Sequence, residues 1–286
     1  MLLLFHCEHT MRSTPLVFYW ILGFAAVAQE TPPVVPPATV PIQVPVLTNS
    51  GKPMLLPFRC SEDDIHWAGL SCTEEEPCPV FLELSAAEQG GNRIVTVGNI
   101  HTESVTLYSV LLTSDDGGRT WSEAHERIRG SGLDRIQFFG ADRGWALGQE
   151  LFPIPQDPFL LVTTDGGKTW QKKSIFSEAS ENHYGSIVQF AFAAKNEASL
   201  VIDRGRSSPD DRYVLFESPD GGENWDVKQE STKPLQLKNP AIPSGDWRIR
   251  ADASSKSFQV EHRQSARWVP VGAFSVKLDA CKPPSN

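Results

Sequence analysis

The sequence predicts an all-β fold, a β-propeller of about four to five four-stranded blades. Two observations lead to this prediction. From about residue 54 onward, short β-rich runs alternate with Gly, Asp, Ser and Pro clusters, and no dozen residues show the 3.6-residue period of a helix. An eight-residue motif also recurs three times at intervals of about 50 residues, a spacing typical of repeats that each form one blade.

The repeated motif has the pattern Ser/Thr-x-Asp-x-Gly-x-Thr/Asn-Trp. Its fixed positions are Ser114, Asp116, Gly118, Thr120 and Trp121; Thr163, Asp165, Gly167, Thr169 and Trp170; and Ser218, Asp220, Gly222, Asn224 and Trp225. Hydroxyl and carboxylate side chains hydrogen-bond nearby amides in turns, glycines permit positive φ, and the Trp buries apolar surface. We interpret the motif as a structural hairpin turn with a core Trp. A calcium loop would need more oxygen ligands than one fixed Asp, so neither metal nor cofactor is expected.

Three predicted strands precede each copy of the motif. They are residues 80–84, 93–97 and 107–112; residues 135–139, 144–148 and 159–162; and residues 187–193, 199–202 and 213–216. A degenerate fourth copy is predicted at residues 247–251, 257–262 and 268–271, where only Trp268 of the motif remains. Residues 54–67 are interpreted as a partial copy that adds strands to a blade closed by the C-terminus.

These motifs resemble the BNR/Asp-box repeats of sialidases, sortilin-type receptors, and photosystem II assembly and stability factors. The stretch from Gly144 to Gly148, followed by residues 163–170, is most similar to the assembly-factor group. The resemblance implies a β-propeller with its Asp boxes on the blade periphery, away from a central site. It covers residues 80–230 well and implies a fold more than an activity.

The N-terminus is typical of an export signal. Residues 16–25 form an apolar run too short to span a bilayer comfortably, and Ala26-Val27-Ala28 is a small-x-small cleavage site. We expect a signal peptide at residues 1–28, with Met11 a candidate for the true start, and an uncleaved anchor as the alternative. A Pro-rich linker at residues 29–53 and the propeller at residues 54–286 should follow, in a secreted or periplasmic protein without a stable membrane span.

Four cysteines follow the predicted cleavage site: Cys60, Cys72, Cys78 and Cys281. An even count in an exported chain favours disulfides, and three pairings are open. Closing a propeller brings its ends together, so we expect Cys281 to pair with one of the other three. A zinc site is the alternative, but no CxxC knuckle supports it.

Charge and motifs disfavour several functions. The net charge is −9 and no basic stripe is present, so a nucleic-acid partner is not expected. The Arg-Ile-Pro motif that resemblance to sialidases implies is absent, since Gln137 follows Arg135 and Ile136. No Gly-x-Ser-x-Gly or His-Glu-x-x-His motif occurs either. We therefore predict no catalytic residues, with a diverged glycoside hydrolase as the alternative.

The loops opposite the motif turns are the predicted binding region. Residues 149–158 carry three prolines, and residues 203–212 carry the candidate binding residues Arg204, Arg206, Asp210 and Asp211. Long loops on a rigid scaffold are where recognition usually resides. The predicted function is a non-catalytic exported scaffold that recognises a protein or peptide, with carbohydrate as an alternative ligand.

Overall fold

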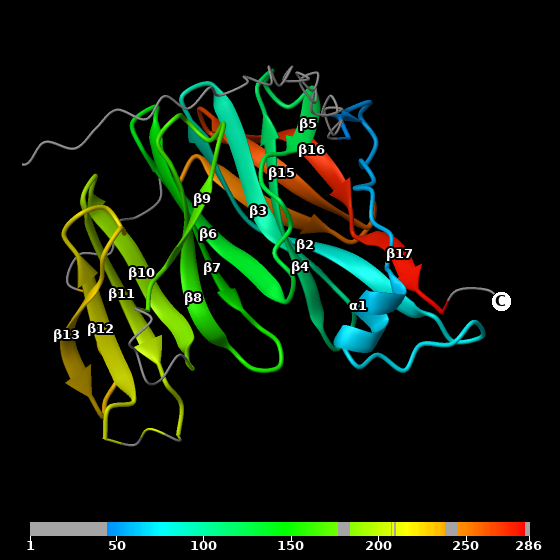
Figure 1. The fold of residues 1–286 in the computed structure, drawn as a ribbon. Helices are drawn as coiled ribbons and strands as arrows, with labels where there is room; N and C mark the ends of the chain where they lie inside the picture. Colours follow the sequence, from blue (N-terminus) through cyan, green and yellow to red (C-terminus); the bar gives the residue numbers. More distant parts are fainter. Residues whose placement is uncertain (1–44, 177–183, 207, 209, 238–244, 284–286) are drawn as a thin grey trace, which may run out of the picture. The chain divides into compact units, whose positions relative to one another are not determined.

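The computed structural model describes residues 45–176, 184–206, 208, 210–237 and 245–283. The chain divides into two compact units, Met1–Ile42 and Gln43–Asn286, and all described residues belong to the second. These residues form four antiparallel sheets and one short helix (Figure 1). Within this part of the chain, no helix has the length and apolar character needed to cross a bilayer. The predicted signal peptide and most of the linker lie outside the described residues.

The first sheet, sheet A, contains six strands in the order β1-β5-β4-β3-β2-β17. Its strands are β1 (Leu47–Thr48), β2 (Cys78–Gly90), β3 (Arg93–His101), β4 (Thr106–Ser114), β5 (Thr120–Glu123) and β17 (Lys277–Cys281). The four central strands form one predicted repeat. The added outer strands come from the two ends of the described chain, so sheet A joins these ends.

The next two sheets are the four-stranded units that the repeat predicts. Sheet B contains β6 (Ser131–Phe139), β7 (Arg143–Glu150), β8 (Gln156–Thr163) and β9 (Gln171–Ser174). Sheet C contains β10 (Ser186–Ala194), β11 (Glu197–Asp203), β12 (Tyr213–Ser218) and β13 (Asp226–Ser231). In both, successive strands pair as neighbours, as in a propeller blade. The predicted all-β fold with four-stranded units is confirmed.

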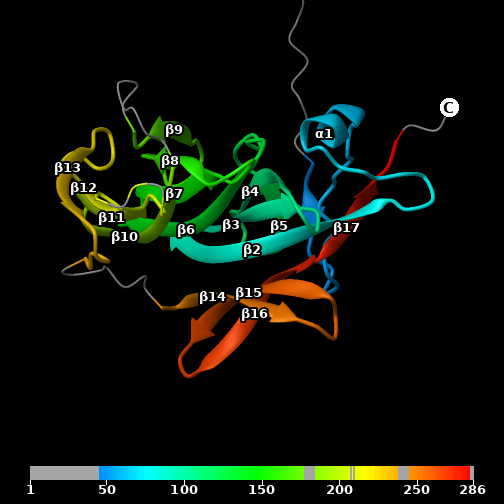
Figure 2. The same ribbon diagram turned by 90° about the horizontal axis from the view of Figure 1, so that it is seen from below.

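The last sheet, sheet D, is three-stranded and corresponds to the degenerate fourth copy. Its strands are β14 (Trp247–Asp252), β15 (Ser257–Gln264) and β16 (Arg267–Ser275), paired in that order. Sheet D lies against β2 of sheet A, as Figure 2 shows. All three predicted strands of this copy are present, although its turn has lost the motif.

Hydrophobic clusters join the sheets in the order D, A, B, C. One cluster packs Leu82 and Leu112 of sheet A against Val260 and Phe274 of sheet D. A second packs Val97 of sheet A against sheet B, and a third packs Trp145 of sheet B against sheet C. Among the described residues, no cluster contains side chains of both sheet C and sheet D.

The same contacts recur between successive sheets. Arg93 opens β3 and its Nη1 lies 3.4 Å from the Gly166 carbonyl oxygen in sheet B. Arg143 opens β7 and its Nη2 lies 3.4 Å from the Gly221 carbonyl oxygen in sheet C. A Cβ built on Gly222, where φ is +89°, would lie 2.6 Å from Leu160 Cδ1, so only glycine fits at this approach.

The motif Trp residues differ in burial. Trp121 and Trp170 are buried, and each indole Nε1 donates to a glycine carbonyl of its own turn at 3.1 Å. Trp225, which we expected in the core, is only half-buried, and its Nε1 has no partner among the described residues. At this turn the indole Nε1 of Trp145 in sheet B donates to the Gly221 carbonyl, and Trp225 packs against the edge of the hydrophobic cluster that contains Trp145.

Residues 54–67 do not add a set of blade strands, which corrects the prediction. Met54 makes a single bridge to Phe274 of sheet D, and Glu62–Trp67 forms the helix α1. Ser61 caps this helix, because its Oγ accepts from Asp64 N while Asp64 Oδ2 accepts from Ser61 N. A Ser-x-x-Asp capping signal therefore overrides the expected strand.

Two disulfides cross-link the chain. Cys60 pairs with Cys281 across a separation of 221 residues, and Cys72 pairs with Cys78 across six. The long-range bond joins the segment before α1 to β17. Cys281 thus pairs with one of the three N-terminal cysteines, as expected, and the other two close a short local loop.

Candidate functional site

One carboxylate organises each of the three Asp turns, which we define as residues 114–121, 163–170 and 218–225. In the second turn, Asp165 Oδ1 accepts from Thr163 Oγ1 at 2.8 Å and from the amides of Lys168 and Thr169 at 3.0 Å each. Its Oδ2 accepts from Thr169 Oγ1 at 2.7 Å. The other two turns repeat this arrangement around Asp116 and Asp220. Each carboxylate thus stabilises the hairpin turn in which it lies.

Hydrogen bonding keeps these carboxylates ionised. The backbone and side-chain hydrogen bonds from Thr120 lower the pKa of Asp116 to about 2. Burial alone would raise the pKa of Asp165, but hydrogen bonds from Thr169 and Thr163 outweigh it and lower that pKa to about 2. The Asn224 amide donors lower the pKa of Asp220 in the same way. These groups are stable hydrogen-bond acceptors, unsuited to proton transfer near neutral pH.

The loops at the other end of sheets B and C meet around a hollow of about 270 Å³. Antiparallel pairing places the β7–β8 and β11–β12 loops opposite the Asp turns. The hollow is lined by Ile154, Pro155, Tyr184, Gly185, Ser186, Asp203, Arg204 and Gly205. The structure therefore brings together the two loops that the sequence singled out.

Apolar and polar groups share this hollow. The side chains of Ile154 and Tyr184 are 50% and 51% exposed, which is high for residues of this size. Gly185 N donates to the Pro155 carbonyl at 3.1 Å, so the residue directly before β10 is tied to the β7–β8 loop. A backbone hydrogen bond thus fixes one wall of the hollow, and the exposed side chains of Ile154 and Tyr184 offer it apolar surface. This arrangement suits a short peptide segment.

Arg204 is held by ion pairs, which changes its expected role as a freely exposed binding residue. Its side chain is 13% exposed, and its guanidinium pairs with Asp211 and lies 3.8 Å from Glu230. Its Nε is buried and has no partner among the described residues. Arg206 and Asp210 are exposed. Arg204 and Asp211 therefore brace the loop.

A second ion pair closes the base of the same loop. Arg212 donates to both Asp203 carboxylate oxygens, at 2.8 and 2.9 Å. This pair, with a further bond from Gly205 N, lowers the pKa of Asp203. The loop is consequently shaped before any ligand arrives.

A polar cluster also ties α1 to sheet A. Tyr108 Oη donates to Asp64, and Arg129 lies 3.1 Å from the same carboxylate. Burial would raise the pKa of Asp64, but the Tyr108 and Ser61 hydrogen bonds and the Arg129 charge lower it overall. Burial and Asp64 together raise the pKa of Tyr108, so its hydroxyl stays protonated. Because Asp64 is 2% exposed, this Tyr–carboxylate pair has little access to a substrate.

Strands β2 and β6 carry two acids, Glu83 and Asp134, whose relation the sequence alone did not reveal. Both side chains are solvent-exposed, yet partial desolvation raises the pKa of Asp134 on β6; the Arg135 charge opposes this rise, and the Glu83 charge on β2 adds to it. Asp134 is the bulged residue of β6. The two acids stand 51 positions apart in different repeats, so only the packing of β2 against β6 relates them.

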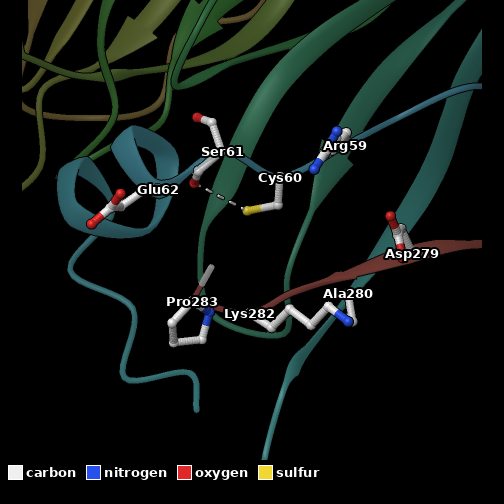
Figure 3. Close-up of a pocket in the computed structure, with 8 residues that line it drawn as sticks. All are labelled: Arg59, Cys60, Ser61, Glu62, Asp279, Ala280, Lys282 and Pro283. Atoms are coloured by element: carbon white, nitrogen blue, oxygen red, sulfur yellow. Dashed lines mark hydrogen bonds between the residues drawn. The ribbon is translucent and has the colours of Figure 1, made fainter. Parts of the chain in front are cut away.

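Another hollow, of about 390 Å³, lies beside the Cys60–Cys281 disulfide (Figure 3). Its charged side chains are Arg59, Glu62, Asp279 and Lys282. Two charges of each sign favour neither an anion nor a cation. Among the described residues, no group of three or more His, Cys, Asp or Glu side chains is arranged to hold a metal ion.

The sequence matches one protein family over most of its length. Residues 38–254 match the BNR repeat-like domain. A curated relative is the chloroplastic photosystem II stability/assembly factor HCF136 of Arabidopsis thaliana, 24% identical over 194 residues. The match covers 66% of this chain and 41% of that protein, so the chain spans about two fifths of its relative's length.

Solved structures with some likeness include two of YCF48. YCF48 bound to D1 peptide is 17% identical with a TM-score of 0.36, covering 70% of this chain and 58% of that one. YCF48 from Cyanidioschyzon merolae is 20% identical with a TM-score of 0.33, covering 68% and 56%. The GH74 xyloglucanase from Xanthomonas campestris is 20% identical with a TM-score of 0.34, covering 48% and 19%.

Proposed function

Since this chain belongs to the BNR repeat-like domain family, we propose that it is a non-catalytic binding propeller that recognises a protein or peptide through the hollow opposite its Asp turns. The three turns would be Asp boxes in the sense of the BNR repeats, each with a purely structural carboxylate. The observation that carries the proposal is the hollow itself. Loops of two sheets converge there around exposed Ile154 and Tyr184.

The chemistry of the hollow indicates how a peptide would be held. Ile154 and Tyr184 would cover apolar side chains of a bound peptide. The curated relative is named as an assembly factor, and a YCF48 structure is described with D1 peptide bound. A protein or peptide partner for this chain is in keeping with those names.

We place this activity outside the cytoplasm. Support comes from the apolar run and small-x-small site before residue 29, and from the pairing of all four later cysteines in disulfides. Secreted and periplasmic locations both fit these features. Fractionation of cells that express the tagged chain would test this, and recovery with the cytoplasmic fraction would contradict it.

Affinity purification tests the binding site. The tagged chain is recovered from its native envelope, and proteins retained by wild type are compared with those retained by the double variant Ile154→Ser, Tyr184→Ser. We expect the variant to lose at least one specific partner. Leu55→Ser is the matched control, because Leu55 is 55% exposed and lies away from the hollow's lining. Identical partner sets for all three proteins would refute the site.

A glycoside hydrolase is the second candidate function, favoured by Asp134 and Glu83. A carboxyl group whose pKa is raised, in part by the charge of a second acid, is one feature of the general acid in a glycoside hydrolase. Hydrolysis of a panel of oligosaccharides by the purified chain, lost in Asp134→Asn, would establish this function. An inactive wild-type chain would dismiss it.

A further inference from the structure

In sheets A and B, side chains of the sheet itself pack on the face that it turns toward the next sheet in the order D, A, B, C. In each, an arginine that opens the second strand reaches a glycine carbonyl of the next Asp turn. Two residues later, Val95 in sheet A and Trp145 in sheet B lie beneath the second glycine of that turn. The interface is therefore a repeated unit with the same parts at the same positions.

The corresponding face of sheet C is built differently. Its arginine position holds Glu197, and its Val95 position holds Ser199. The segment of residues 235–237 crosses part of this face. Gln189 holds it, because Nε2 donates to Leu235 O and Oε1 accepts from Leu237 N, both at 2.9 Å.

The Gln189 contact copies one that sheet B makes with sheet C. There, Gln149 Nε2 donates to Gly185 O at 3.1 Å and its Oε1 accepts from Ile187 N at 3.2 Å. Segment 235–237 is thus bound by both ends of a glutamine carboxamide, the same kind of contact by which sheet B binds sheet C.

A groove remains beside this segment. Two hollows of about 360 and 470 Å³ share the lining residues Ala193, Ser199, Glu217 and Lys228, so they adjoin along the face. Their other charged lining residues are Glu197 and Asp226. Three acids against one lysine make the groove negative, and a positively charged sheet face would complement it.

Sheet D carries such a face on the side turned away from sheet A. Ile249 and Val260 point into the cluster with sheet A, so strand alternation turns Arg248 and Arg250 outward. Both arginines are 42% exposed, whereas their partners Glu261 and Asp252 are 5% and 18% exposed. The acids lie beneath the guanidinium groups, so the outward charge is positive.

Further residues extend this face. Arg263 is exposed and pairs across the strands with Trp268, and the guanidinium of Arg248 lies 4.2 Å from the Trp268 ring centroid. Hydrogen bonds to Glu261 at 2.7 and 2.9 Å fix the two outer arginines in place. A fixed cationic face with an aromatic side chain loses little side-chain entropy when it packs on a partner.

We propose that the groove face of sheet C in one copy of this chain packs against the arginine face of sheet D in a second copy. Within one chain no hydrophobic cluster contains both sheets, in the part that the structure describes, so a second copy is assigned as the occupant. Two copies related by a two-fold axis form this contact twice, and each acidic face meets an arginine face.

Sedimentation velocity of the full chain at 1 to 100 µM tests the proposal. We expect a dimer for wild type, and a dissociation constant at least about tenfold higher for Glu217→Lys and for Arg263→Glu, because each creates a like-charge contact. Glu103→Lys makes the same charge change on the exposed β3–β4 loop and should leave the dimer intact. Thermal melts confirm that every variant is folded.

A mixing experiment separates a contact between copies from one within a chain. Glu217→Lys mixed with Arg263→Glu pairs the new lysine with the new glutamate, and leaves the other contact as in wild type, so dimers should return. A wild-type chain that is monomeric at 100 µM would overturn the proposal. So would dimers that neither charge reversal weakens, or single-variant monomers that mixing leaves unchanged.

Discussion

Asp165 accepts four hydrogen bonds within one turn, so its replacement should lower the free energy of unfolding. Asp165→Ala leaves the amides of Lys168 and Thr169 without their acceptor. We expect the free energy of unfolding to fall by about 2 kcal/mol, since hydrogen bonds to a charged group are the stronger kind. Denaturant unfolding measures this. Lys168→Ala, which changes an exposed side chain but keeps the amide, is the control.

The same residue should make stability depend on pH. The folded-state pKa of Asp165, about 2, is below its ordinary value of 3.8, so its contribution is complete above pH 3.8. As the pH falls toward 2 the carboxylate takes up a proton and this contribution is lost. The difference in unfolding free energy between wild type and Asp165→Ala should therefore shrink across this window. A difference that stays constant down to pH 2 would contradict the assignment.

Arg143 offers a site for a stabilising substitution. Its counterpart Arg93 donates to both oxygens of Asp115, at 2.6 and 2.8 Å, whereas Thr164 stands at the matching place beside Arg143. Arg143 Nε is buried without a partner among the described residues. Thr164→Asp should therefore raise the unfolding free energy by about 0.5 to 1 kcal/mol. Thr164→Asn is the uncharged control, and equal stability of the two variants would argue against the ion pair.

At the scale of elements, α1 depends on its cap. Ser61 Oγ accepts from Asp64 N and donates to Asp64 Oδ2, and this carboxylate group also binds Tyr108 of β4 and Arg129 of the β5–β6 connection. Ser61→Ala should cost about 1 kcal/mol of unfolding free energy. Ser61→Thr keeps the hydroxyl and should retain most of the stability. Equal losses in both variants would show that the cap is not the cause.

Strand positions were largely predictable, and the exceptions have identifiable causes. The strands of sheet D were found without a motif, because alternating β-rich runs such as Trp247–Ala251 were sufficient. Helix α1 was missed because its six residues are too few to show a period, although Ser61 and Asp64 carried the capping signal. Trp225 packs against the core but is only half-buried, a difference from Trp121 and Trp170 that the shared motif does not reveal.

The candidate site was predictable in place but not in detail. The motif turns fixed which loops lie at the opposite end, and the loops around Ile154 and Arg204 do line one hollow. The bracing of Arg204 by Asp211 and Glu230, and the approach of Glu83 to Asp134, depend on packing between strands. Sequence periodicity contains no information about such contacts.

For the whole molecule, the two disulfides should contribute unequally. Loop-closure entropy favours the longer loop, so loss of Cys60–Cys281 should cost about 5 kcal/mol and loss of Cys72–Cys78 about 2 kcal/mol. Paired Cys→Ser variants, compared by denaturant unfolding, measure both values. A larger loss for the short loop would mean that local geometry, and not closure of the long loop, determines the stability.

The Cys60–Cys281 bond also turns residues 60–281 into a covalent circle that contains sheets B, C and D entire and most of sheet A. A single protease cut in the 204–212 loop would yield a two-chain molecule, which separates only after reduction. New termini placed in that loop, with a peptide linker in place of the sulfur bridge, would encode the same sheets in a rotated order. The order in which the gene encodes the sheets is then one of several orders, each obtained by opening the same circle at a different loop.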